Sequence, residues 1–131
     1  MSRAQALDAL DRLEEADDWA GRAAELGAID DAFTQMLWRQ VRAKVLARRG
    51  QHAEADCLAR EAVAVCADTD MLEAQGDVYA DLAEVLLLGG KPDEAAAALE
   101  DALERYERKG NLVSAGRARA RLAELEDAAQ R

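Results

Sequence analysis

The sequence predicts an all-α protein of stacked antiparallel helix hairpins, and three observations support this class. Half of the 131 residues are apolar but only 4% are aromatic, so most of the apolar content is alanine and leucine, which favour helices. No segment alternates apolar and polar side chains as a half-buried strand does. The stretches GQHAEADCLAREA (50–62) and GKPDEAAAALEDA (90–102) resemble each other at a spacing of 40 residues. This spacing indicates a repeated helix–turn–helix unit within a single domain, 1–131.

Residues 1–30 are interpreted as a partial N-terminal repeat. Small and aliphatic side chains recur there at helical spacing without a breaker, and Asp11 stands where the later repeats carry a turn glycine. One long helix from about Arg3 to Leu26 is therefore favoured, with a short hairpin as the alternative. An array that begins partway through a repeat exposes an apolar face, which we expect a larger protein or a second copy to cover. The apolar series is Leu7, Leu10, Leu13, Ala16, Ala20 and Ala23.

Residues 31–69 form the first complete repeat. Its first helix is predicted from about Asp31 to Arg49 and is closed by Gly50. Its second helix is predicted from about Ala53 to Ala67, and the polar segment 68–70 leads out of it. The apolar side chains at helical spacing are Trp38, Val41 and Val45 in the first helix and Leu58, Ala59, Ala62 and Val63 in the second.

Residues 70–110 form the second complete repeat, with helices over 70–88 and 92–109. Asp70 and Glu73 resemble a capping box at the start of the first helix, and Gly89-Gly90 ends it. Pro92 suits a first helical position, because the N–H that it lacks would have no partner there. The apolar residues at helical spacing are Leu72, Tyr79, Leu82 and Leu86, followed by Ala95, Ala98, Leu99, Ala102, Leu103 and Tyr106.

Residues 111–131 are predicted to form a C-terminal capping helix. Asn111 is a suitable N-cap, because its side-chain oxygen can accept a hydrogen bond from the first turn. The apolar residues occupy one side of this helix only, as expected of the last helix in an array. That side carries Ala115, Ala118, Leu122 and Leu125, and the other carries Arg117, Arg121 and Glu124.

Small residues fall at matching places in the two complete repeats. Alanine allows two helix axes to approach closely, and glycine adopts the left-handed conformation of the turn between them. Together with larger apolar residues at Tyr79, Leu82, Leu86 and Leu99, this pattern resembles the tetratricopeptide repeat (TPR) family over residues 31–125. The repeat-defining positions are Ala43, Gly50, Ala55 and Ala62 in the first repeat and Ala83, Gly90, Ala95 and Ala102 in the second.

The resemblance implies a right-handed α–α superhelix in which the first helix of each hairpin lines a concave, partner-binding face. The period of 40 residues exceeds the ~34 usual for the family, and LWRQVRAKVLARRG (37–50) is similar to helical regions of bacterial signalling proteins. Arg39 and Arg42 occupy places where the family has apolar residues. We expect this helix to be rotated toward its Trp38, Val41 and Val45 face, and pairing of the two arginines with carboxylates is the alternative.

Residues with catalytic or metal-binding chemistry are few. His52 is the only histidine, which argues against a His-rich metal site, and its place at the opening of a helix favours a packing role. Cys57 and Cys66 are nine residues apart in one predicted helix, too far to bridge, and are interpreted as reduced packing residues. Paired carboxylates abound, but the sequence gives no sign of a cleft that would raise the pKa of one of them. We therefore expect no enzymatic activity, no metal and no cofactor.

Charge narrows the class of partner. The formal net charge of −10 argues against nucleic acid and anionic membranes. Residues 31–50 nevertheless carry five basic groups against one acidic group, a local +4, and residues 71–110 carry four against ten, a local −6. Either these hairpins attract each other, which we favour, or they form the two ends of a bipolar groove. Neither a targeting signal nor a long apolar run is present, so we expect a cytoplasmic protein.

The expected function is a non-catalytic protein–protein interaction scaffold, a regulatory module of a bacterial signalling system that holds a protein or peptide. The alternative is a self-association or spacer element of a larger multidomain protein, for example a homodimer. The three consecutive leucines 86–88 cannot all face one core, so they either reach the concave face or pack on the next repeat. The concave-face residues implied by the resemblance are Gln40, Lys44, Arg48, Asp77, Glu84, Leu87 and Leu88.

Overall fold

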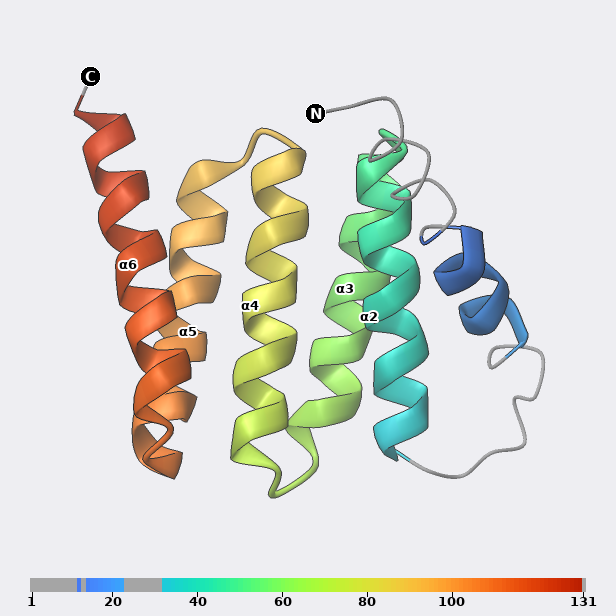
Figure 1. The fold of residues 1–131 in the computed structure, drawn as a ribbon, viewed down its shortest axis with the longest axis horizontal. Coiled ribbons are helices and arrows are strands. Elements are labelled where there is room, and N and C mark those ends of the chain that lie inside the picture. The colour runs from blue at the N-terminus through green and yellow to red at the C-terminus, as the bar shows by residue number, and fades with distance from the viewer. Residues whose placement is uncertain (1–11, 13, 23–31, 131) are drawn as a thin grey trace.

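The computed structural model describes residues 12, 14–22 and 32–130, and helices dominate it (Figure 1). No strand occurs among these residues, so the expected all-α class is confirmed. Residues 14–22 are helical, whereas most of the long helix expected over 3–26 lies outside the described residues. The labelled helices are α2 (Ala32–Arg48), α3 (His52–Ala67), α4 (Leu72–Leu88), α5 (Pro92–Lys109) and α6 (Leu112–Ala129).

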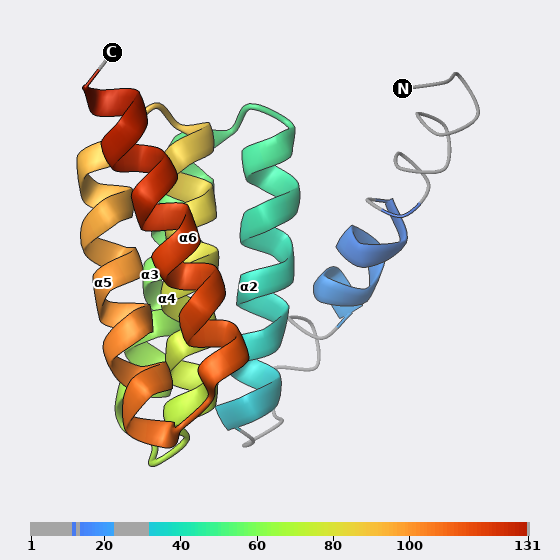
Figure 2. The ribbon, with the colours of Figure 1, turned by 60° about the vertical axis from the view of Figure 1, so that its left-hand side comes forward.

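Successive helices run antiparallel and form two layers (Figure 1 and Figure 2). Helices α2, α4 and α6 lie on one side, and α3 and α5 lie on the other. The most extensive packing joins α2 to α3 and α4 to α5, which are the two predicted hairpins. Helix α6 follows α5 in the same manner and packs against it. No helix in the described part of the chain combines the length and the apolar composition that a membrane span requires.

The three sharp turns between these helices share one design. Gly50, Gly90 and Gly110 adopt positive φ angles of 84°, 76° and 83°, a conformation that residues with a Cβ atom rarely adopt. In each turn the residue after the glycine donates its N–H to a carbonyl five residues earlier, and these N···O distances are all 2.9 Å. This bond satisfies a carbonyl that the end of the helix would otherwise leave without a partner.

The predicted caps are correct at two helices and wrong at a third. Pro92 is the first residue of α5, and the Asn111 side chain accepts a hydrogen bond from the Ser114 N–H at 3.1 Å. Asp70, however, does not cap α4, which begins two residues later at Leu72 and has no side-chain cap. Thr69 organises that turn instead, because its hydroxyl donates to the Cys66 carbonyl at 2.7 Å and accepts from the Met71 N–H at 3.3 Å.

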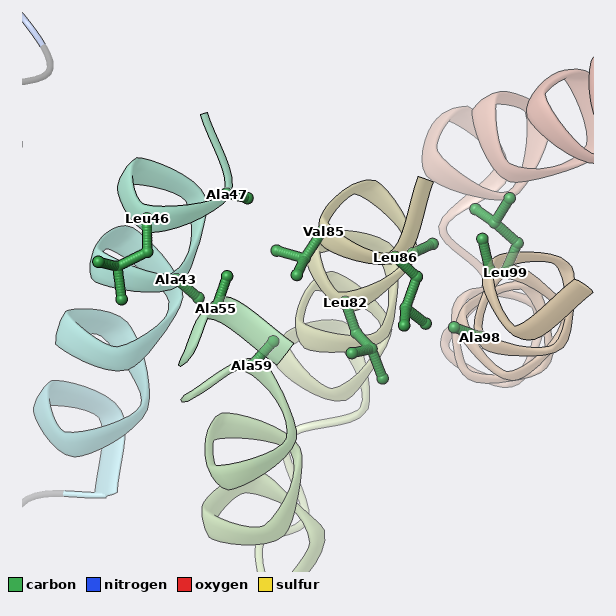
Figure 3. Close-up of a cluster of buried hydrophobic side chains, with 12 residues drawn as sticks. Ala43, Leu46, Ala47, Ala55, Ala59, Leu82, Val85, Leu86, Ala98 and Leu99 are labelled. Atoms are coloured by element: carbon green, nitrogen blue, oxygen red, sulfur yellow. The ribbon is translucent and has the colours of Figure 1, made fainter. Parts of the chain in front are cut away.

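The main hydrophobic core joins α2, α3, α4 and α5 (Figure 3). Small side chains meet where α2 crosses α3, and larger ones from α4 and α5 fill the remaining space. Close approach of the helices in each hairpin depends on the alanines of the repeat pattern, because a larger side chain would force the axes apart. These residues are all at most 1% exposed: Ala43, Ala55, Ala62, Ala83, Ala95 and Ala102.

The expected rotation of α2 toward its Trp38, Val41 and Val45 face is wrong. The face that it turns toward the other helices carries Met36, Gln40, Ala43 and Ala47, all buried, whereas Val45 is buried on the opposite side. Trp38 and Val41 are only partly buried. The two arginines pair with carboxylates, which was the alternative. Arg39 lies 3.7 Å from Glu61, and Arg42 lies 3.7 Å from Asp17 in the helical segment 14–22.

Candidate functional site

A groove with a volume of about 670 Å³ runs between α2, α4 and α6. The groove lies on one side of the molecule, because the three helices share one layer (Figure 2). Its lining combines apolar side chains with carboxylates and arginines. The residues are Phe33, Met36, Leu37 and Gln40 from α2; Ala74, Asp77, Ala80, Asp81, Ala83, Glu84 and Leu87 from α4; Leu99 and Tyr106 from α5; and Ser114, Arg117, Ala118 and Arg121 from α6.

The apolar part of the groove begins at the first turns of α2. Phe33 is 50% exposed there, and it is one of the most exposed large apolar side chains in the described residues. Met36 is buried and Leu37 is partly buried, so the lining passes from the core to the surface within one helical turn. Leu87 lines the groove from α4 while packing against the main core. An apolar surface of this kind can accept the apolar side of a ligand.

A row of carboxylates on α4 forms the acidic wall of the groove. Asp77, Asp81 and Glu84 are spaced four and three residues apart and therefore share one helix face. Each carboxylate already has an intramolecular partner. Asp77 accepts a hydrogen bond from the Tyr106 hydroxyl at 2.5 Å, and Glu84 pairs with Arg48 at 3.6 Å.

Asp81 is the most constrained of the three carboxylates. It accepts a hydrogen bond from the Gln40 amide at 2.8 Å and lies 3.3 Å from the Lys44 ammonium. Burial raises the pKa of its carboxyl above the ordinary value, although Lys44 and Gln40 act in the opposite direction. Gln40 is itself only 6% exposed, so its hydrogen bond satisfies a polar group that would otherwise be buried without a partner.

Tyr106 connects the groove to the packing of the second hairpin. Its ring lies directly against Gly76 of α4, where an added Cβ atom would stand only 2.5 Å from the ring carbon Cε1. The missing side chain at Gly76 therefore creates the space for the tyrosine. Burial, followed by the hydrogen bond to Asp77, raises the pKa of the Tyr106 hydroxyl far above its ordinary value. Both effects favour the protonated form of the hydroxyl, which is the form that donates to Asp77.

The structure separates the residues that the TPR resemblance assigned to the concave face. Gln40, Asp77, Glu84 and Leu87 line the groove. The three others do not line it: Leu88 is 47% exposed, and the side chains of Lys44 and Arg48 are engaged with α4 carboxylates.

The charge pattern of the two hairpins therefore produces attraction between α2 and α4, which was the favoured interpretation. A free basic end of the groove is not formed by Lys44 or Arg48, because both lie against acidic side chains of α4. Arg60 of α3 and Glu94 of α5 make a similar contact across the other layer, at 3.4 Å. These exposed pairs contribute about 0.2–1 kcal/mol each.

Sequence reasoning missed the contributions of α6 and of the start of α2. Arg117 and Arg121 are four residues apart on α6 and form a basic wall opposite the α4 carboxylates. Arg121 also pairs with Glu124 at 2.7 Å. The sequence places these arginines on the face of the capping helix opposite its apolar residues. Their helical spacing together with Ser114 was the available signal, but only the position of α6 beside α4 brings them to a groove.

The remaining chemically active side chains lie outside the groove. His52 opens α3, is exposed, and borders a separate cavity of about 230 Å³ near Gly89 and Lys91. Cys57 is exposed, so its expected packing role is wrong, whereas Cys66 is buried and burial raises the pKa of its thiol. Both thiols are free.

The described residues contain no group of three or more histidine, cysteine, aspartate or glutamate side chains placed to hold a metal ion. Comparison of the chain with protein-family models, with curated proteins and with solved structures yields no significant match.

Proposed function

We propose that this chain is a non-catalytic protein–protein interaction scaffold of the TPR-like type, with a right-handed arrangement of its hairpins. The observation that carries this proposal is the groove between α2, α4 and α6. These are the first helices of the two hairpins and the helix that follows them, which are the elements that line the concave face in TPR-like arrays. A cytoplasmic regulatory module of a bacterial signalling system is the setting that the residue pattern favours.

The lining of the groove suggests the chemistry of the ligand. Phe33, Leu37 and Leu87 offer an apolar strip, and charged walls of opposite sign stand on α4 and α6. An amphipathic helix or an extended peptide fits such a surface when its apolar side chains enter the strip. Its acidic groups would face Arg117 and Arg121, and its basic or amide groups would face the α4 carboxylates.

Support for a non-catalytic role comes from the titratable side chains of the groove. Asp77, Asp81 and Glu84 are each held by a tyrosine, amide or basic partner of the same chain. General acid–base catalysis requires a proton-transfer group directed at a reacting atom, whereas these carboxylates join helices to one another. A role that needs neither metal nor cofactor is consistent with this use of the acidic side chains.

The proposal is tested with a random peptide library displayed on phage and selected on the immobilised protein. Phe33→Asp places a charge in the apolar strip. Leu88→Asp is the matched control, because Leu88 is similarly exposed, at 47% against 50%, but lies outside the groove. We expect selected peptides to carry apolar residues three or four positions apart, to lose at least about tenfold in affinity for Phe33→Asp, and to bind Leu88→Asp normally.

Two outcomes would overturn this assignment of the groove. One is equal loss of affinity in both variants while their melting temperatures and helical circular dichroism match the wild type. The other is a failure of the library to yield any peptide that binds the folded protein. The alternative function, self-association within a larger assembly, is favoured by a different observation, the exposed side of α6.

A further inference from the structure

The exposed side of α6 repeats the side of α4 that receives other helices. Gly76, Ala80 and Ala83 of α4 recur 40 residues later as Gly116, Ala120 and Ala123. In α4 this side is covered, since Tyr106 of α5 lies on Gly76 and Ala83 is 1% exposed.

In α6 the corresponding residues are exposed to solvent. Gly116, Ala120 and Ala123 are all exposed. Among the described residues, nothing beyond the helix's own backbone would lie within 4 Å of a Cβ atom added at Gly116. At the start of the helix, Leu112 and Val113 are 75% and 67% exposed, the highest values among the large apolar residues of the described chain. The exposed side of α6 therefore has the composition of a helix-packing surface, and no helix in the described part of the chain packs on it.

The spacing of these residues is that of a seam between two helices. Val113, Gly116, Ala120 and Ala123 are separated by three, four and three residues, as in a heptad repeat. A second set of apolar residues on the opposite side of α6 faces the protein's own core and includes Ala115 and Ala118, both buried. Small residues along the outer seam would let a second helix approach closely.

The charges beside the seam select the partner. Arg117 and Arg119 flank its N-terminal half, and Glu124 and Glu126 flank its C-terminal half. A second α6 in antiparallel orientation, with Ala120 opposite Ala123 of the other copy, would place each arginine beside a glutamate. A shift by one heptad would place arginine beside arginine, and a parallel orientation would align the like-charged halves. The surface is therefore self-complementary in one orientation and one register.

We propose that the outer face of α6 (Val113, Gly116, Ala120, Ala123 and their flanking charges) is an interface between two antiparallel copies of this chain. Continuity with the existing fold supports it, because a second α6 would cover Gly116 as Tyr106 of α5 covers the corresponding Gly76 of α4. The interface lies on a different side of α6 from Ala118 and Arg121, which line the groove. Arg117 borders both surfaces. The other interface residues do not line the groove, so dimer formation is tested separately from peptide binding.

The proposal is tested by reversing the charges beside the seam in two separate variants and by mixing these variants. Molar mass is measured by light scattering across a range of concentrations. We expect the wild type to reach twice the mass of one chain, and the double variants Arg117→Glu/Arg119→Glu and Glu124→Arg/Glu126→Arg each to remain monomeric. An equimolar mixture of the two variants should restore the dimer, because every arginine then faces a glutamate of the other chain. The reversals also remove surface pairs of Arg119 with Glu107 and of Glu124 with Arg121, so helical content is checked by circular dichroism.

A matched control changes charge elsewhere by the same amount. Asp93→Arg/Glu100→Arg alters two exposed acidic residues of α5 and should leave the dimer intact. A wild type that stays monomeric at all concentrations would overturn the proposal. So would a dimer that both α6 double variants retain, or one that the α5 variant abolishes to the same extent.

Cysteine cross-linking tests the orientation. In a Cys57→Ser background, which removes the exposed thiol, Ala120→Cys is mixed with Ala123→Cys and oxidised. An antiparallel interface should link the two variants to each other more rapidly than either variant links to itself. Faster self-linking of Ala120→Cys would indicate a parallel pair and contradict the proposed orientation.

Discussion

Helices α4 and α6 carry the same small residues 40 positions apart, yet their burial is opposite. Gly76 is covered by the ring of Tyr106, whereas the corresponding Gly116 has open space where a side chain would be. Ala83 is buried at 1% exposure, and its counterpart Ala123 is exposed. Small residues at the packing positions of a helix therefore become part of a core only when another segment supplies a complementary surface.

Replacing the paired alanines should give the largest difference between the two helices. Ala83→Leu inserts a larger side chain into the main core and should reduce the free energy of unfolding by about 1–3 kcal/mol. Ala123→Leu, at an exposed position, should change it by less than about 0.5 kcal/mol under conditions that keep the chain monomeric. Urea denaturation followed by circular dichroism measures both. Equal effects would show that the two positions do not differ in packing.

The paired glycines should give effects of opposite sign. Gly76→Ala places a Cβ atom 2.5 Å from a ring carbon of Tyr106, and we expect a net loss of about 1 kcal/mol after the gain in helix propensity is subtracted. Gly116→Ala meets no neighbour and should stabilise the protein by up to about 1 kcal/mol, because alanine is the better helix former. Melting temperatures measured under conditions that keep the chain monomeric separate these outcomes. A stabilised Gly76→Ala variant would contradict the described contact.

Substitutions at two tyrosines separate the contribution of the Tyr106 hydrogen bond to stability from that of ring packing. Tyr106→Phe keeps the ring on Gly76 but removes the donor to Asp77, and it should cost about 0.5–1.5 kcal/mol. Tyr79→Phe is the control. The Tyr79 ring packs against the core, with the Cζ atom of Arg105 4.8 Å from the ring centre. No hydrogen bond from the Tyr79 hydroxyl to a carboxylate is found among the described residues. The loss of stability in Tyr79→Phe should be smaller. Identical denaturation midpoints for Tyr106→Phe and the wild type would assign the contact to the ring alone.

The smallest effect is expected at Asp81, whose contacts hold α4 to α2. Burial raises its folded-state pKa above the ordinary value of 3.8, so the fold favours the neutral carboxyl. The stabilising contribution is therefore complete below pH 4 and is lost as the pH rises through the folded-state pKa. Asp81→Asn stays neutral and can still accept the Gln40 hydrogen bond, although it loses the Lys44 pair. Its stability relative to the wild type should therefore improve as the pH rises from 4 to 7.

Urea titrations of the two proteins at several pH values measure this difference. A relative stability of Asp81→Asn that falls as the pH rises would show that Lys44 outweighs burial. Asp93→Asn is a suitable control because Asp93 is exposed in the first turn of α5, away from α2.

Prediction from sequence was most accurate where a structural signal is local. The turn glycines Gly50 and Gly90, Pro92 and Asn111 each act on residues within about five positions of themselves, and their helices end or begin as expected. The predicted cap at Asp70 is wrong because Thr69 organises the same turn. The Thr69 hydroxyl donates to the Cys66 carbonyl and accepts from the Met71 N–H. The prediction of which face of α2 is buried is wrong for a different reason. Val45 and Ala43 are both buried on opposite sides of that helix, and hydrophobic periodicity alone does not rank two such faces.

The groove was predicted only in part. Gln40, Asp77, Glu84 and Leu87 are at lining positions, because a helical register carries a whole face with it once the hairpin is recognised. The ion-pair partners of Lys44 and Arg48 could not be identified from the sequence, because its many carboxylates allow many possible pairs. Only the contact of α2 with α4 selects Asp81 and Glu84 among them.

By itself the sequence determined the helices, their turns and the alanines at which the hairpins close, because these depend on backbone propensity and on spacing along one chain. The tertiary structure alone decided which faces are covered. It directed Arg39 and Arg42 to carboxylates, placed the arginines of α6 beside the acidic wall of α4, and left Gly116 open while covering Gly76. The physical reason is that burial and ion pairing are properties of two surfaces in contact, and a repeat in the sequence specifies only one of them.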